Sequence, residues 1–244
     1  MKQIITIVIL AFISLVNTIA QDFKRIDYLF DFGTTLSIPY KKTIEIWPDF
    51  DGHPQTDYST NFGYFLEFMV SYNLNTNYAI GTGLNYNYGS LKVDNKITLF
   101  ENKGNLTNSY LTLPLLIKYR LTDKIPISLS VGTYLSVLMG AHEKGTTYID
   151  TAGIKFSDPN DPVLMEIEPE QKYNTDIKQD YSSMDYGLLI QLEYEFELKK
   201  GLKGIILSRF NYGLKNVITN DMLNYSIATE WKNYNMLIGF GVRL

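Results

Sequence analysis

The feature that most constrains this chain is an alternation of apolar residues with small or polar ones, which recurs along most of its length. Side chains of a β-strand point alternately to its two faces, so a period of two predicts strands with one apolar face. Eight stretches show the pattern, residues 28–40, 62–74, 78–90, 110–121, 127–140, 184–198, 203–214 and 234–244. Each stretch is long enough to cross a bilayer when tilted.

The connections between these stretches alternate in length. The short ones cover residues 75–77, 122–126 and 199–202, and the long ones cover 41–61, 91–109, 141–183 and 215–232. An even number of antiparallel strands, with short turns at one end and long loops at the other, is typical of outer-membrane barrels. We therefore predict an all-β fold, an eight-stranded antiparallel up-and-down transmembrane β-barrel with short periplasmic turns and long extracellular loops.

The distribution of glycine indicates which face of the strands lies outside. A soluble barrel such as a lipocalin would place the apolar face in its lumen. The interior of an eight-stranded barrel is only just wide enough for side chains to fill, so this many bulky residues do not fit there. The opposite face has 11 of the 17 glycines, namely Gly33, Gly63, Gly81, Gly83, Gly89, Gly132, Gly140, Gly187, Gly213, Gly239 and Gly241. We therefore expect the apolar face to contact lipid, with an aromatic girdle near each end of the strands.

Charged residues of both signs fall on the face that we assign to the lumen. They are Asp31, Glu67, Lys118, Arg120, Asp185, Glu193, Glu195, Arg209 and Arg243, with Glu197 near the end of its strand. An unpaired buried charge is costly, so we expect these groups to form a network of ion pairs that plugs the barrel. A path for protons or ions is the alternative. Pro114 conflicts with its strand, because proline cannot donate to the ladder, and we expect a local distortion there.

The N-terminus predicts export of the chain. A basic start at Lys2, an apolar stretch over residues 4–16 and small residues at Thr18 and Ala20 are typical of a signal peptide (residues 1–20), which leaves a barrel domain over 21–244. With 22 basic and 26 acidic residues the net charge is −4, so there is no basic footprint for nucleic acid. The absence of cysteine excludes disulfides and thiolate chemistry.

No motif predicts a catalytic, cofactor or metal site. The segment Asp51-Gly-His53 and the pair His142-Glu143 lack further partners at ligand or catalytic spacing, so we interpret them as solvated loop residues. The acidic stretch over residues 157–170 has oxygen ligands suited to Ca²⁺, but it lacks the spacing of an EF-hand loop. Asp150-Thr-Ala152 fits a short O-glycosylation pattern, which three residues match often by chance.

Several strand sequences resemble one known family. Tyr110–Leu121 (YLTLPLLIKYRL) resembles the YLxIPLLLKYRF signature of the PorT-type outer-membrane β-barrel family of Bacteroidota. Residues 130–135 are similar to its AGPYLG strand, with Thr133 in place of proline. Residues 184–187 and 208–217 resemble its FDFG and RYSYGLTNI motifs, and 237–244 resembles its closing strand, although Leu244 stands where many such proteins end in phenylalanine. The resemblance implies the barrel fold and an outer-membrane location, and it implies no catalytic residues.

We therefore expect a non-enzymatic barrel in the bacterial outer membrane, without a cofactor, that has a binding, structural or accessory role. Its extracellular loops, chiefly residues 141–183, would bind a protein partner and would assist a secretion or surface complex. A small pore or transporter for ions or small solutes is the alternative. The expected partners include membrane lipid and the outer-membrane insertion machinery, which we expect to recognise Phe240, Val242 and Leu244 on the last strand. We expect no nucleic-acid partner.

Overall fold

The computed structural model describes residues 25–39, 43–45, 55–97, 100–122, 125–149, 169–199, 202–218 and 231–244. The predicted signal peptide (residues 1–20) lies outside these ranges, and its boundary with the barrel domain stays a prediction. No helix in the described ranges is long and apolar enough to cross a membrane.

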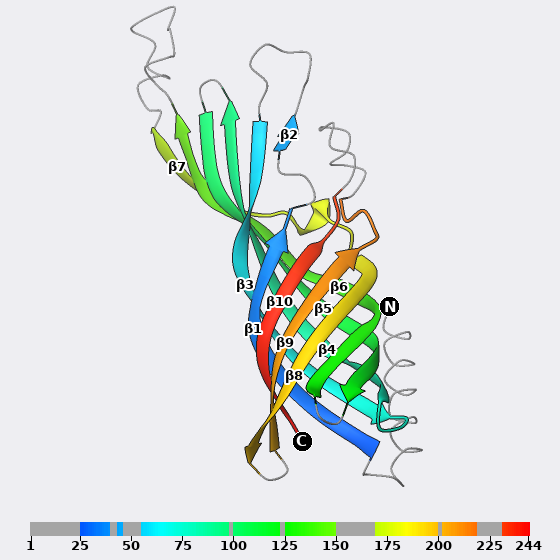
Figure 1. Ribbon diagram of the computed structural model, residues 1–244. Coiled ribbons are helices and arrows are strands. Elements are labelled where there is room, and N and C mark those ends of the chain that lie inside the picture. The colour runs from blue at the N-terminus through cyan, green and yellow to red at the C-terminus, as the bar shows by residue number, and fades with distance from the viewer. Residues whose placement is uncertain are drawn as a thin grey trace, which may run out of the picture.

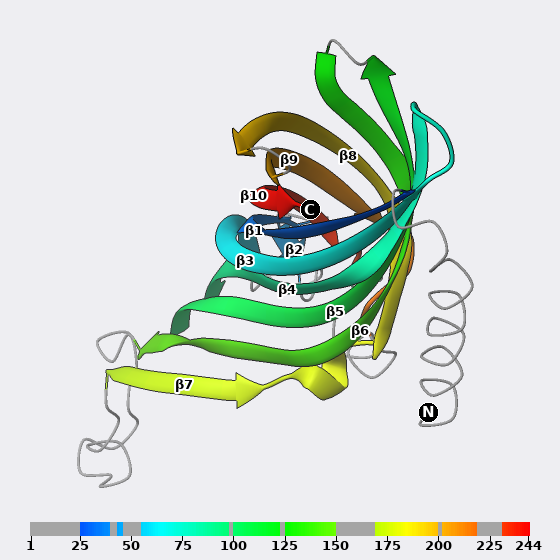
Figure 2. The ribbon, with the colours of Figure 1, turned by 90° about the horizontal axis from the view of Figure 1, so that it is seen from below.

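Eight long strands form a closed barrel (Figures 1 and 2). They are β1 (Ile26–Ile38), β3 (Gln55–Asn73), β4 (Tyr78–Ile97), β5 (Phe100–Thr122), β6 (Ile125–Ile149), β8 (Met184–Lys199), β9 (Leu202–Gly213) and β10 (Tyr234–Arg243). Neighbouring strands are antiparallel, and β1 closes the ring by pairing with both β10 and β3. Two backbone hydrogen bonds between Tyr28 and Leu244 (N–O 3.3 and 2.9 Å) continue this seam at the short-turn end. The predicted fold class is confirmed.

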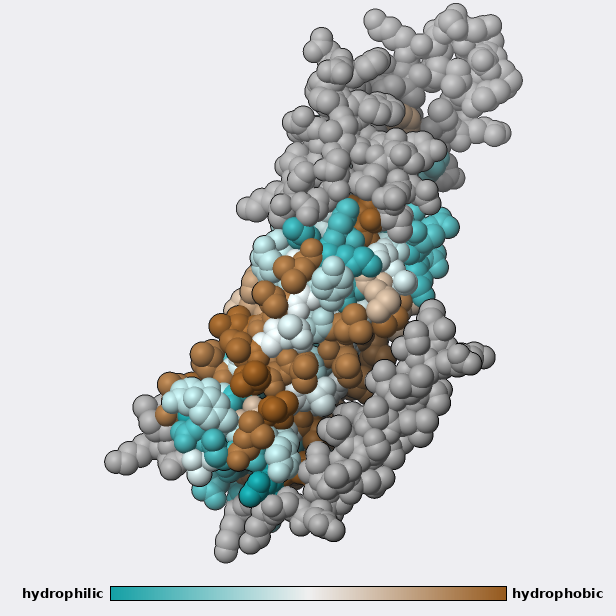
Figure 3. Space-filling view, turned by 90° about the vertical axis from the view of Figure 1, so that its right-hand side faces the viewer, coloured by the Kyte–Doolittle hydropathy of each residue, from teal (hydrophilic) through white to brown (hydrophobic). Residues whose placement is uncertain are grey.

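The outer wall of the barrel is apolar and the inner wall is largely polar. In β8 the even-numbered Leu188 is 49% exposed, whereas the odd-numbered Gln191 and Glu193 are each 1% exposed. Figure 3 shows the hydrophobic band across the middle of the barrel on one side, with hydrophilic residues toward both ends. This orientation follows from size, because a lumen of eight strands has no room for a complete set of large apolar side chains.

Aromatic side chains gather at both borders of the apolar band. At the end with long connections, Tyr64 stacks on Tyr88 (ring centroids 5.0 Å apart) and Tyr212 stacks on Tyr234 (4.8 Å). At the short-turn end Tyr78 packs against Tyr119 (5.0 Å). Amphipathic rings favour the membrane interfaces, so these pairs mark the two surfaces of the bilayer. Tyr40, the aromatic residue at the end of the first predicted strand (28–40), lies outside the described residues.

Four strands continue beyond the barrel, and here three predicted loops (41–61, 91–109 and 141–183) are wrong in part. β3 begins at Gln55, β4 ends at Ile97, β5 begins at Phe100 and β6 ends at Ile149. Most of the predicted loop over 91–109 is therefore a hairpin, connected by residues 98–99 alone. The segment has the alternation of a strand, because Leu91 and Val93 of β4 both point inward and are buried. The many charged residues between and around them make this alternation hard to recognise in the sequence.

Two short strands widen the protruding part into a sheet. β2 (Thr43–Glu45) pairs with β3, and β7 (Glu170–Asp176) pairs with β6, followed by a 3₁₀ turn, η4 (Lys178–Asp180). The predicted loop over 141–183 thus contains the end of β6, β7 and η4 in its described part. We name β2, β7 and residues 55–60, 91–97, 100–107 and 141–149 the extracellular sheet. It leans away from the barrel body, as Figure 1 shows.

Two β-bulges lie where the extracellular sheet leaves the barrel. The register shifts between β3 and β4 at Thr60/Tyr64, where the extra residue is on β3, and between β5 and β6 at Ser109/Tyr110, where the extra residue is Met139 of β6. The pairing of β4 with β5 contains no such shift. A bulge bends its strand and increases the local twist, so the two bulges provide the physical reason for the change of direction.

Pro114 distorts the wall less than we expected. The ladder pairs Thr82 of β4 with Leu115 and next Asn85 with Thr112, so it skips two positions but keeps one register. The Thr82 hydroxyl donates to the carbonyl oxygen of Pro114 (2.8 Å). On the other side Pro114 stays paired with Tyr134 of β6. The missing proline N–H therefore interrupts the hydrogen bonding of one ladder without shifting the strand.

Candidate functional site

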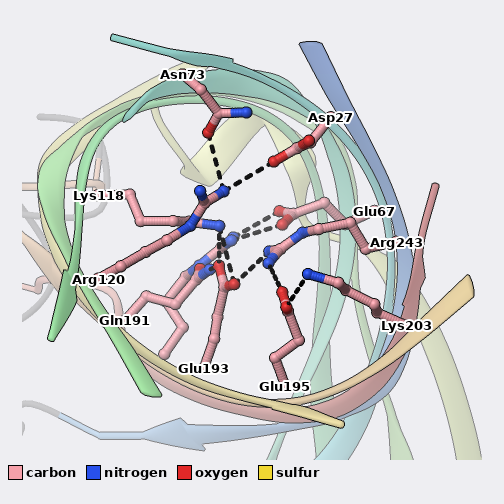
Figure 4. Close-up of polar contacts among 11 residues, drawn as sticks. Asp27, Glu67, Asn73, Lys118, Arg120, Gln191, Glu193, Glu195, Lys203 and Arg243 are labelled. Carbon is pink, nitrogen blue, oxygen red and sulfur yellow. Dashed lines mark hydrogen bonds and ion pairs between the residues drawn. The ribbon is translucent and has the colours of Figure 1, made fainter. Parts of the chain in front are cut away.

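The short-turn half of the lumen contains a layer of buried ion pairs, drawn in Figure 4. Glu193 of β8 is at its centre and accepts a hydrogen bond from Lys118 Nζ of β5, with an ion-pair distance of 2.7 Å. Arg243 of β10 donates to Glu193 and also to Glu195 Oε2 (2.5 Å). Three strands that are not all neighbours thus contribute to one cluster. The side chains fill the cross-section in which a solute would pass.

A second pair joins this cluster through a neutral residue. The two terminal nitrogens of Arg209 each donate to one carboxylate oxygen of Glu67 at 2.5 Å. Its Nε donates to Gln191 Oε1 (2.5 Å), and Gln191 Nε2 donates to Glu193 Oε1 (2.7 Å). Arg209 and Glu67 are each only 2% exposed, so both charges are held away from water. Bidentate pairs of this kind are strong and fix their geometry, which makes this part of the plug rigid.

Two pairs closer to the short turns complete the layer. Arg120 donates to Asp27 Oδ2 and to Asn73 Oδ1, both at 2.9 Å. Lys203 Nζ lies 2.5 Å from Glu195 Oε1 and remains largely exposed. We name Asp27, Glu67, Lys118, Arg120, Gln191, Glu193, Glu195, Lys203, Arg209 and Arg243 the ionic layer.

The structure places three of the predicted lumen charges outside these pairs, and one of them, Glu197, is exposed near the end of β8. Asp31 lies opposite Glu67 in the ladder of β1 and β3, and within the described ranges neither of its buried carboxylate oxygens has a hydrogen-bond partner. Asp185 lies nearer the extracellular end, where it accepts hydrogen bonds from Tyr134 (3.3 Å) and Asn233 (3.0 Å). Both of its donors are neutral side chains.

Three members of the ionic layer were not among the residues predicted from the sequence. Asp27 and Lys203 lie at strand ends outside or at the edge of the predicted stretches, and Gln191 is neutral. Gln191 has the same parity as Glu193 and therefore the same face, which was the available signal. The sequence does not indicate which lumen charges pair with each other, since partners such as Glu67 and Arg209 are 142 residues apart.

Toward the extracellular end the lumen becomes a small chamber whose polar walls contain one carboxyl group, that of Asp185. Asn233 links Asp185 to Tyr110, whose hydroxyl lies 3.1 Å from its Nδ2. A cavity of about 10 Å³ remains between these side chains and Asn211. That volume has room for about one water molecule. The chamber is therefore large enough for a water molecule and too small for a nutrient.

An apolar cluster covers the chamber at the extracellular mouth. Its members come from the wall and from segments that fold back over it, namely Leu91, Val93, Leu106, Tyr110, Leu138, Ala141, Ile177, Tyr181, Val217 and Trp231. We name this set the apolar cap. Tyr58 packs edge-on against Trp231 (ring centroids 4.7 Å apart). Burial, with a smaller contribution from Glu143, raises the pKa of Tyr58 to about 12. The sequence did not predict this cluster, because most of its members lie in segments that we expected to be loops.

The extracellular sheet ends in an exposed strand. In the described part of the chain β7 pairs with β6 alone. Its Tyr173 lies over Gly104 and Gly145 and donates to Glu143 Oε1 (2.9 Å). Burial and the neighbouring Glu143 raise the pKa of Tyr173 well above its usual range. The central side chain of β7 is thus held against the sheet, although most of the strand is exposed.

The remaining predicted residues are distributed over separate places. His142 is exposed on the outer face of the extracellular sheet, whereas residues 51–53 and 150–168 lie outside the described ranges. Within those ranges no group of three or more His, Asp or Glu side chains is arranged to hold a metal ion. Phe240, Val242 and Leu244 face outward on the last strand. Their role in insertion stays a prediction.

The chain is similar to known outer-membrane proteins. A family model described as outer membrane protein beta-barrel domain matches residues 19–219. No curated protein matches the chain. The solved structure of outer membrane protein OprG from Pseudomonas aeruginosa is 14% identical, covers 89% of this chain and 95% of its own, and gives a TM-score of 0.44. Neisserial surface protein A is 11% identical (89% and 96% covered, TM-score 0.41), and Ail of Yersinia pestis is 12% identical (90% and 99% covered, TM-score 0.38).

Proposed function

This chain belongs to the family of outer membrane proteins with a β-barrel domain, and from that premise we propose that it is a non-enzymatic binding barrel with a closed lumen. In this proposal the extracellular sheet binds a protein partner. The motifs of residues 110–121 and 208–217 support placing it among the PorT-type barrels of Bacteroidota, with an accessory role in a secretion or surface complex. The proposed contacts with membrane lipid follow from the apolar outer wall.

The observation that supports binding over transport is the double closure of the lumen. The ionic layer fills the short-turn half, and the apolar cap covers the opposite mouth. The chamber between them has a cavity of about 10 Å³. To pass through, a solute would have to break buried ion pairs and displace an apolar cluster. Breaking a buried ion pair is costly in free energy, and no new contacts along the part of the lumen that the structure describes would offset that cost. In contrast, the extracellular sheet is built as a regular structure outside the membrane.

The edge of β7 provides a specific way to bind a partner. Ile177 N donates to Ala141 O and Ile149 N donates to Pro169 O, so odd-numbered residues of this segment turn their backbone groups toward β6. The even-numbered Lys172 and Asn174 therefore turn their N–H and C=O groups toward the open edge. An extended segment of a partner would add a strand there through main-chain hydrogen bonds. Exposed edges of this kind are ready templates for pairing.

The test is purification of the tagged protein from native outer membranes in mild detergent, followed by identification of stoichiometric partners. Lys172→Pro removes one edge N–H and leaves the bonds to β6 in place, so we expect loss of the partner. Lys172→Ala removes the same side chain and keeps the N–H, so it should retain the partner. Equal recovery with both variants would contradict binding at the β7 edge.

A small pore is the alternative, and one observation favours it. Buried polar atoms without hydrogen-bond partners in the described structure occur along the lumen, at Ser130, Asn85 and Asn211 among others. Such atoms bind water, and a file of water molecules conducts protons or ions. Planar-bilayer recording distinguishes the two functions. We expect no conductance from the wild type or from Glu193→Ala, and channels only when Trp231→Ala also removes the apolar cap. Conductance of the wild-type protein would replace the binding proposal with a pore.

A further inference from the structure

The outer face of the extracellular sheet contains a polar groove directly above the outer aromatic girdle. β4 and β5 pair without a register shift, so the face that contacts lipid at Tyr86 and Tyr88 continues upward through Lys92 and Asp94. On β5 the same face continues from Leu111 through Thr107 and Asn105. The sheet leans away from the barrel (Figure 1), and this face of it is the direct continuation of the lipid-facing wall.

Two hollows form the groove. The lower one has a volume of about 410 Å³ and lies between Tyr88, Asn61, Asn105, His142, Lys144 and Asn174. The upper one, of about 530 Å³, shares Asn105 with it. Both volumes fall in the range of small-molecule sites. The lining is almost entirely hydrogen-bonding, with a tyrosine at its lower end, which suits a ligand with many hydroxyl groups.

Part of the lining is held in position by contacts within the groove. Asn61 Nδ2 donates to Ser90 Oγ (3.0 Å) and to Asn105 Oδ1 (3.2 Å). These contacts leave the Oδ1 of Asn61 to accept and the Nδ2 of Asn105 to donate. A fixed donor and a fixed acceptor side by side match neighbouring hydroxyls of a sugar ring, and their prior ordering lowers the entropic cost of binding.

The charges of the groove change with distance from the membrane. One cross-strand row holds Lys92, Asn105, Lys144 and Asn174 in register. Neither lysine of this row has an ion-pair partner among the residues that the structure describes. Their Cα atoms are two strand spacings apart, about 10 Å. The lower hollow is lined by Lys144 and by no acidic residue, whereas Asp57 and Asp94 line the upper one together with Lys92 and Lys103. An anionic group is therefore favoured near the membrane and a neutral one farther out.

We propose that this groove binds the phosphorylated saccharide headgroup of a glycolipid in the outer leaflet. Its phosphate would contact Lys144 and Lys92, its sugars would hydrogen-bond to Asn61 and Asn105, and its acyl chains would remain in the bilayer beside the Tyr64–Tyr88 stack. The observations fit this occupant because the cationic part of the groove adjoins the lipid-facing wall. The site is independent of the β7 edge, since the edge uses backbone groups and the groove uses side chains of the outer face.

The experiment titrates the purified full chain, in detergent micelles, with rough-type lipopolysaccharide and measures bound glycolipid by native mass spectrometry. The double variant Lys92→Gln/Lys144→Gln removes the cations of the groove. The matched control, Lys96→Gln/Lys172→Gln, removes equal charge from the same face outside both hollows. We expect at least tenfold weaker binding for the groove variant and less than a twofold change for the control. Equal binding by the two variants would overturn the proposal, and the heat-dependent shift on SDS gels verifies that each is folded.

Three further probes distinguish the source of the ligand. Dephosphorylated lipopolysaccharide should bind at least tenfold more weakly to the wild type, and the lipid-free phosphorylated core saccharide should compete at higher concentration. Inorganic phosphate should not compete at the same molar excess. If phosphate alone displaced the glycolipid, or if dephosphorylation had no effect, a glycolipid headgroup site would be refuted. These results do not depend on a protein partner, so failure here and failure of the β7 proposal are separate outcomes.

Discussion

The two ends of the lumen are closed by different interactions, ion pairs at the short-turn end and apolar burial at the extracellular mouth. At the short-turn end a complete ring of strands surrounds the ionic layer, so each charge at its centre finds partners on opposite walls, as Glu193 does with Lys118 and Arg243. At the extracellular mouth the closure is a lid of apolar side chains, in which Val217 and Trp231 come from segments that follow and precede strands. The closed ring provides fixed geometry, whereas the mouth depends on non-directional burial.

This difference determines how each closure responds to a substitution. A buried ion pair is weak evidence of net stability, yet loss of one partner leaves an uncompensated charge and is strongly destabilising. An apolar cluster loses stability in proportion to the surface and volume removed. The ionic layer should therefore be sensitive to single changes and tolerant of matched double changes, whereas the apolar cap should lose stability with every truncation, in proportion to the volume removed.

The largest effect should follow removal of the bidentate cation. Arg209→Ala leaves Glu67 buried without its partner, and we expect a loss of about 3–5 kcal/mol in the free energy of unfolding. Urea unfolding of the detergent-solubilised barrel measures this loss. The double variant Glu67→Leu/Arg209→Met removes both charges and should recover most of it. If the double variant were as unstable as Arg209→Ala, the ionic layer would not behave as a set of matched pairs.

Removal of the cap's largest side chain should have the next largest effect. Trp231→Ala deletes an indole that is 4% exposed and packs against Tyr58. Because the cavity left behind cannot collapse completely, we expect a loss of about 3 kcal/mol. Trp231→Phe keeps most of the volume and should lose less than half as much. Hydrogen exchange should speed up at the extracellular end and stay unchanged in the ionic layer; uniform acceleration would show that the two closures unfold together.

A pH titration should report on the cap alone. The pKa of Tyr58 is raised to about 12 from the usual 10.0, so the native state holds this proton more tightly than the unfolded chain does. The resulting stability is complete below pH 10 and is lost as the pH rises through about 12. In a Trp47→Phe background, Trp231 fluorescence should change with a midpoint near pH 12. Tyr58→Phe should abolish the transition, and a midpoint at the usual pKa would contradict burial of Tyr58.

The smallest effect should come from the rim of the ionic layer. Lys203 is 55% exposed at its side chain, so its pair with Glu195 is screened by water. We expect Lys203→Ala to lower the free energy of unfolding by at most about 1 kcal/mol, and by less in high salt. Comparison of urea midpoints at low and high ionic strength measures both quantities. A loss of stability as large as that of Arg209→Ala would show that water is excluded from the Lys203–Glu195 pair as completely as from the centre of the ionic layer.

The sequence predicted the barrel because its alternation is a local property. Residues 184–198 already separate Leu188 and Ile190 from Gln191 and Glu193, and this assigns each side chain to a wall without knowledge of any neighbour. The closed lumen limits side-chain volume, so the apolar wall has to face lipid. The same reasoning gave a wrong result over residues 91–109. The charged residues Lys92, Asp94 and Lys96 lower the hydrophobicity of this segment, so a hairpin was predicted to be a loop.

Tertiary structure alone decided which residues meet. Parity places Glu67 and Arg209 on the lumen side, but strand tilt and register bring them together across 142 residues, and they leave Asp31 without a partner in the described structure. The bulges on β3 and β6 turn the sheet outward, and this part of the molecule contains both the β7 edge and the polar groove. Strand faces follow from a repeat of two residues, whereas register, closure and bending depend on contacts between distant segments. The sequence by itself therefore determined the fold and the membrane-facing wall, and the folded chain decided how the lumen is closed and where a partner can bind.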